Sequence, residues 1–121
     1  MPREYRLLSA EPVDLRIVRD AADQVDPTLR PRLLFGGWAV QLVDRDGVAV
    51  LTVEASRLLD DVGQAEALIS GASGTGRTPG TGPQWWTEAS APWGEHGGPG
   101  ARLARVIAGS VQARMLAEEG L

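Results

Sequence analysis

The chain has 121 residues with 12 basic and 16 acidic side chains, and every basic residue is arginine because lysine is absent. A composition of 43% hydrophobic and 23% charged residues is ordinary for a globular domain and excludes wholesale disorder. The lack of cysteine excludes a disulfide framework, a thiolate nucleophile and a cysteine-bound metal. The net charge of -4 argues against nucleic acid as a partner.

Nothing in the sequence predicts insertion into a membrane. No apolar run approaches the ~20 residues of a membrane span, and the first residues lack the core of a signal peptide. We therefore expect a cytoplasmic protein. Asparagine is absent as well as lysine, and this bias indicates a bacterial genome rich in GC base pairs.

The first predicted elements are a strand and a helix. Residues 3–8 alternate polar and apolar side chains, which is typical of a short strand. Pro12 suits the first turn of a helix, where its missing N–H is no loss. Apolar residues then recur at helical spacing as far as Val25, and Asp26-Pro27 ends the helix.

A hairpin follows, and it is the strongest local signal in the chain. Residues 38–43 and 48–54 are both rich in β-branched side chains, and Asp44-Arg45-Asp46-Gly47 lies between them. Glycine accepts the positive φ that such a turn requires. Gly36-Gly37 is interpreted as a bend that re-aims the first of these strands, which would begin at residue 33.

The second half of the sequence predicts a helix, a strand and a further helix, in that order. Ser56 is a candidate cap for a helix to residue 69, and a flexible glycine-rich loop follows at 70–82. Residues 84–89 are predicted to form a strand, with a second loop at 92–98. The last helix would start at Pro99 and carry an apolar stripe to about residue 117. Its members are Leu103, Ile107, Val111 and Met115.

These elements predict one α+β domain over residues 1–121. The order β-α-β-β-α-β is the ferredoxin-like order, with a four-stranded, mostly antiparallel sheet and an added C-terminal helix. The helices would cover one face of that sheet.

The sequence motifs that would indicate ligand binding or catalysis are weak. Residues 71–78 match the spacing of a phosphate-binding loop, but Arg77 replaces the lysine and Pro79-Gly80 blocks the helix that should follow. His96 is the only histidine and lies among glycines, where a solvated side chain is the ordinary outcome. We expect no cofactor, no metal and no catalytic set, although Glu95 or Glu88 could orient His96 in a catalytic role.

Tryptophan is the most informative residue type, with four among only six aromatic side chains. Trp85 and Trp86 are adjacent, so a strand would direct them to opposite faces of the sheet. One of them must be covered by the C-terminal helix, by a subunit or partner, or by a ligand. Trp38 and Trp93 complete the set of interface or ligand candidates, together with His96 and Glu88.

Residues 84–118 resemble a segment of uncharacterised actinobacterial proteins, some of which are encoded near type VII secretion genes. The resemblance is carried by Gln84-Trp85-Trp86-Thr87-Glu88-Ala89-Ser90-Ala91-Pro92, a glycine linker and an Ala/Arg-rich helix. It implies a bacterial, cytosolic accessory role and offers no catalytic residue to carry over.

Two functions remain open from the sequence. The first is a non-catalytic interaction or accessory domain that binds a protein partner, or a second copy of itself, through an exposed surface of tryptophan and helix. The alternative is a small-ligand-binding protein or enzyme with a pocket near Trp85, Trp86 and His96.

Overall fold

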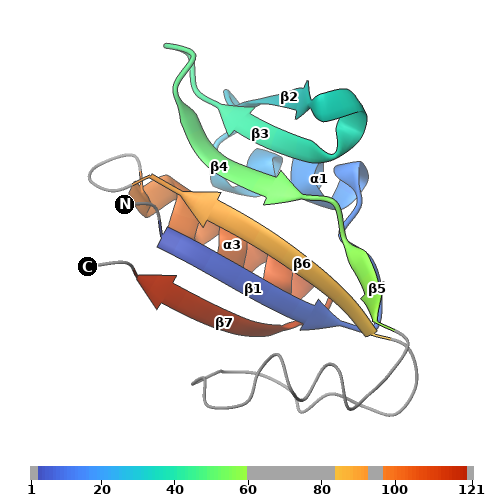
Figure 1. The fold of residues 1–121 in the computed structure, drawn as a ribbon. Helices are drawn as coiled ribbons and strands as arrows, with labels where there is room; N and C mark the ends of the chain where they lie inside the picture. The colour runs from blue at the N-terminus through green and yellow to red at the C-terminus, as the bar shows by residue number, and fades with distance from the viewer. Residues whose placement is uncertain (1–2, 60–83, 93–96, 120–121) are drawn as a thin grey trace.

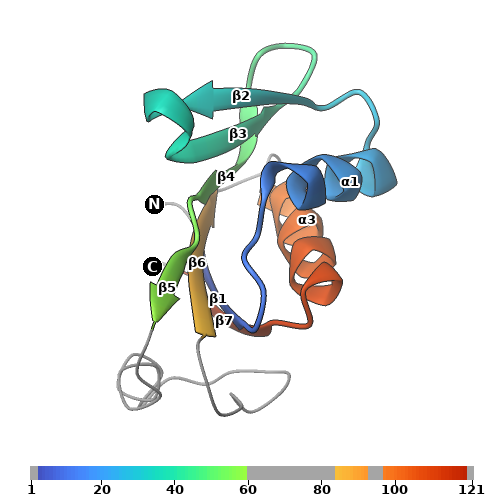
Figure 2. The same ribbon diagram turned by 90° about the vertical axis from the view of Figure 1, so that its right-hand side faces the viewer.

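The computed structural model describes residues 3–59, 84–92 and 97–119, which form one antiparallel sheet with two helices on one face (Figure 1). Figure 2 shows both helices on the same side of β1, β6 and β7. The elements are β1 (Arg3–Ser9), α1 (Leu15–Val25), β2 (Arg30–Leu34), a 3₁₀ turn (Phe35–Gly37), β3 (Ala39–Val43), β4 (Ala49–Glu54), β5 (Arg57–Leu59), β6 (Gln84–Ala91), α3 (Gly97–Ser110) and β7 (Arg114–Glu119).

The ferredoxin-like prediction is wrong. Seven strands are present in the described part of the chain, in the order β2-β3-β4-β6-β1-β7, with β5 paired to β6. Every pairing between neighbours is antiparallel. The strands at 3–8 and 84–89 and the hairpin at 38–54 are confirmed, so the error lies in the segments between and after them.

The first correction concerns Gly36-Gly37. These residues do not bend one strand but reverse the chain, so that β2 and β3 form a hairpin in which Leu34 lies opposite Ala39. Positive φ angles of 66° and 99° at the two glycines make the reversal possible. In Figure 2 this hairpin lies over α1, at one end of the helix layer.

The second correction concerns Ser56, which does not cap a helix. Residues 57–59 form β5, and β4 and β5 follow one another along the same edge of β6. Val53 lies opposite Ala89 and Arg57 opposite Trp86, so four steps on one strand match three on the other. This extra residue is a β-bulge. The remainder of the predicted helix, the loop at 70–82 and most of the loop at 92–98 lie outside the described residues.

The third correction concerns the last helix, which ends at Ser110, with β7 pairing to β1. Gln112 has a φ of 50° and occupies the left-handed position just past the helix end. Its N–H donates to the carbonyl of Gly109, and the N–H of Ala113 donates to that of Ala108. These two bonds form a Schellman motif, which ends a helix. Met115 therefore belongs to a strand. At the other end, residues 97 and 98 already belong to α3.

The main core fills the space between the helices and the sheet. Asp14 caps α1 by accepting from the N–H of Ile17 at 2.9 Å, and the helix buries Val18, Ala21 and Ala22. α3 lies close to β4 and β6 at Gly100, where a Cβ atom would collide with the Val50 carbonyl oxygen and the Ala91 Cβ. Close helix–sheet packing thus explains this glycine.

Candidate functional site

Large apolar side chains are exposed at one end of the molecule, on the β2–β3 hairpin. Leu33 is 60% exposed, Phe35 82% and Trp38 69%. A single exposed apolar residue is ordinary, whereas three within six positions of one hairpin call for an explanation. We name these three residues the apolar tip.

The backbone of the apolar tip is strained. Phe35 has a φ of 51°, in the left-handed region that bulky side chains rarely adopt. A residue held in this way costs on the order of 1–3 kcal/mol, and the side chain of Phe35 is too exposed to recover that cost by burial. At the far side of the turn, the carbonyl of Trp38 accepts from the N–H of Ala55 at 2.7 Å, which ties the tip to the end of β4.

Two hollows adjoin the apolar tip. The smaller has a volume of about 210 Å³ and is polar, with Trp38 on one side and charged residues around it. The larger has a volume of about 370 Å³, with Leu33 and Gly37 from the hairpin and apolar residues from α1 and β4. Glu54 and Ala55 line both. The two hollows therefore share the end of β4, with the larger on the helix side of the sheet and the smaller on the opposite side.

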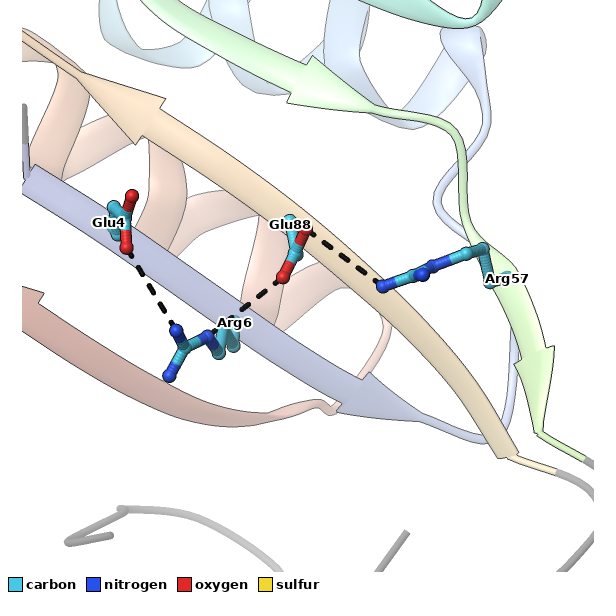
Figure 3. Close-up of polar contacts among 4 residues, drawn as sticks. All are labelled: Glu4, Arg6, Arg57 and Glu88. Atoms are coloured by element: carbon cyan, nitrogen blue, oxygen red, sulfur yellow. Dashed lines mark ion pairs between the residues drawn. The ribbon is translucent and has the colours of Figure 1, made fainter. Parts of the chain in front are cut away.

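A chain of charges crosses the sheet face that lies away from the helices. Figure 3 shows Arg6 between Glu4 and Glu88, with Arg57 reaching Glu88 from the other side. Each of the three ion pairs has an N–O separation of 3.9 Å. All four side chains are partly exposed, and ion pairs of this kind contribute at most ~1 kcal/mol. They set the charge of this face more than the stability of the fold.

Of the residues proposed from the sequence, Trp38 and Glu88 come together, since both line the smaller hollow. Trp86 is 3% exposed and packs with Leu8, Leu59 and Leu116 in a second cluster, on the face away from the helices. Trp85, opposite Ser9, has the other orientation because side chains alternate along β6. The prediction that the two tryptophans point to opposite faces is confirmed.

The C-terminal helix does not cover the outward tryptophan. α3 packs against the face that carries Ala89 and Ala91, which lie in the main core, whereas Trp86 points away from it. Trp85 and Trp86 therefore lie on opposite sides of β6. Trp93, His96 and the loop at 71–78 lie outside the described residues.

The sequence reasoning missed Leu33, Phe35 and Arg57. A usable signal was present for the first two, because paired glycines between apolar runs also favour a tight hairpin turn. Such a turn would have left the flanking aromatic residues at an exposed tip. No local pattern indicates that Arg57 and Glu54 approach Trp38, since this depends on the bulge between β4 and β5.

Little else in the described residues points to chemistry. No group of three or more His, Asp or Glu side chains within them is arranged to hold a metal ion. Hydrogen bonds from the Thr28 hydroxyl and N–H lower the pKa of Asp26. Asp26 follows α1 and lines neither hollow.

Comparison of the chain with protein-family models, with curated proteins and with solved structures gives no match. Among the helices described, none has the length and apolar character needed to cross a membrane.

Proposed function

We propose that this chain is a non-catalytic interaction domain, accessory to a larger assembly, and that a protein partner binds the apolar tip. The observation that carries the proposal is Phe35, whose side chain is 82% exposed on a backbone with a φ of 51°. Stability alone would favour glycine or asparagine at such a position. An exposed aromatic ring on a strained backbone is explained by contact with another molecule.

The chemistry of the tip supports the same proposal. Aromatic residues dominate the binding energy of protein interfaces, and tryptophan is the most enriched of them. The hydrogen bond between Ala55 and Trp38 holds the backbone of Trp38 in place before a partner arrives, which lowers the entropy lost on binding. The resemblance of residues 84–118 also implies an accessory role, and we keep the cytoplasm of a bacterium as the proposed location.

Co-purification from the encoding organism tests this function. We expect a protein that is retained by the wild-type chain and lost by Trp38→Ala, because removal of a central aromatic side chain costs about 2 kcal/mol or more of binding. Arg105→Ser is the matched control, since Arg105 is exposed on α3, away from the tip. Retention of the same proteins by all three chains would contradict the proposal.

A second copy of the chain is another possible occupant of the tip, and light scattering distinguishes it. A dimer that Trp38→Ala converts to a monomer would make the partner a second copy. A wild-type chain that stays monomeric over a wide concentration range directs the search to a different protein.

A further inference from the structure

The partner's chemistry follows from the two hollows beside the apolar tip, if the proposed function holds. Leu33 and Gly37 line the larger hollow and Trp38 lines the smaller. The larger hollow lies on the side of the sheet that faces α1, and the smaller lies on the opposite side, which carries Glu88. Only a segment that wraps over the turn at the tip reaches both. The larger hollow is apolar along Val13, Val40 and Val53, and it suits a bulky apolar side chain.

The smaller hollow has a different character. Its volume of about 210 Å³ is below the ~300–1,000 Å³ of typical small-molecule sites, and it is open on the surface. One side chain of a partner is a better match for this space than a cofactor. The indole of Trp38 forms part of its wall, and the face of an indole ring attracts a cation.

The charges around both hollows are mainly negative. Glu54 lines both and is exposed, and no ion pair to another described residue reaches it. Glu88 lines the smaller hollow and is shared between Arg6 and Arg57 at 3.9 Å. Asp14 lines the larger hollow. Arg6 and Arg57 offset Glu88, and Asp14 accepts from the N–H of Ile17, so Glu54 is the lining carboxylate left for a partner's cation.

We propose that the partner is a segment that wraps over the tip and carries a basic and a bulky apolar side chain, with the basic group in the smaller hollow and the apolar group in the larger. The cation lies on Trp38 and pairs with Glu54, while the apolar side chain contacts Leu33. Arginine fits better than lysine because its planar guanidinium both stacks on an aromatic ring and binds a carboxylate through two hydrogen bonds.

Selection from a display library of random 12-residue peptides tests the proposed chemistry. On the wild-type chain we expect enrichment of peptides that carry Arg or Lys within a few residues of Leu, Ile, Phe or Trp. On Glu54→Arg we expect Asp or Glu to replace Arg or Lys in the enriched peptides, because the charge of residue 54 is reversed. Glu54→Gln, which removes the charge without reversing it, should weaken the preference for a basic residue.

Affinities of one selected peptide give the magnitudes. Glu54→Gln should weaken binding about two- to five-fold, as expected for one exposed ion pair. Trp38→Ala should weaken it about 30-fold or more. Asp23→Asn is the control, since Asp23 is an exposed carboxylate on α1 that lines neither hollow, and it should leave the affinity unchanged. Circular dichroism confirms that each variant is folded.

The outcomes separate this inference from the proposed function. Peptides that require Trp38 but show no preference for a basic residue would overturn the inference and leave the function standing. Absence of any enriched peptide, or equal binding by Trp38→Ala, would overturn both. A wild-type dimer from which the peptides are excluded would identify a second copy as the occupant and would also overturn the inference.

Discussion

The backbone conformation of Phe35, with a φ of 51°, lowers the stability of the fold. We expect Phe35→Asn to raise the free energy of unfolding by about 0.5–1 kcal/mol, because asparagine tolerates positive φ and the ring buries little. Phe35→Ala removes the same ring but keeps the strain, so its change should stay within about 0.5 kcal/mol. Urea unfolding of the two variants measures the difference. Equal stabilities would mean that φ at residue 35 carries no strain.

Asp26 provides a second prediction at the scale of one residue. The Thr28 hydroxyl donates to Asp26 Oδ1 at 2.7 Å and the Thr28 N–H at 2.9 Å, and together they lower the pKa of this carboxyl below its ordinary value of 3.8. A pKa lowered in the folded state gives stability that is present above 3.8 and is lost as the pH falls through the lowered value.

Thr28→Val removes the hydroxyl donor and keeps the backbone donor. We expect the pKa of Asp26 to rise toward 3.8 in this variant, so that less stability is lost in acid and the loss is complete at a higher pH. Titration of the Asp26 carboxyl by NMR measures this shift. An unchanged titration of Asp26 would show that the hydroxyl bond is absent in solution.

Among the elements, the bulge between β4 and β5 is the joint that forms the candidate site. Ser56 lies in it, accepts from the N–H of Val13 at 2.9 Å and shares a hydrogen bond with the Thr87 hydroxyl at 2.7 Å. Thr87 is fully buried, so its hydroxyl depends on this partner. The serine that resembled a helix cap in the sequence instead links three segments of the chain.

Ser56→Ala should lower the free energy of unfolding by about 1–3 kcal/mol, because it leaves a backbone donor and a buried hydroxyl without a partner. Ser110→Ala is the matched control, since Ser110 is exposed and donates only to the Val106 carbonyl of its own helix. Its effect should be within about 0.5 kcal/mol of zero. Thermal unfolding of both variants checks this, and equal losses would rule out the role assigned to Ser56.

At the scale of the whole molecule, local signals predicted the elements whose cause is local. The Asp44–Gly47 turn is one example: the Asp44 carboxylate accepts from the N–H groups of Asp46 and Val48, and Gly47 has a φ of 80°. The pairing of β7 with β1 could not be predicted in this way. The stripe that ends at Met115 continues a helical spacing, and only the left-handed conformation of Gln112 interrupts it.

The candidate site was predictable to a smaller extent. Trp38 and Glu88 stood among the proposed residues because of their chemical type. Their proximity depends on pairing between strands far apart in the sequence, and no local pattern contains that information. Phe35 was overlooked because the glycines after it were interpreted as a bend within one strand.

Photo-crosslinking in the encoding organism tests the central claim that the apolar tip is the interaction surface. A photoreactive phenylalanine at position 35 replaces one exposed aromatic ring with another, and the same residue at position 105 on α3 serves as the reference. We predict one defined crosslinked protein from position 35 that is absent from position 105 and lost when Trp38→Ala is added. No adduct from position 35, or the same adducts from both positions, would contradict the claim.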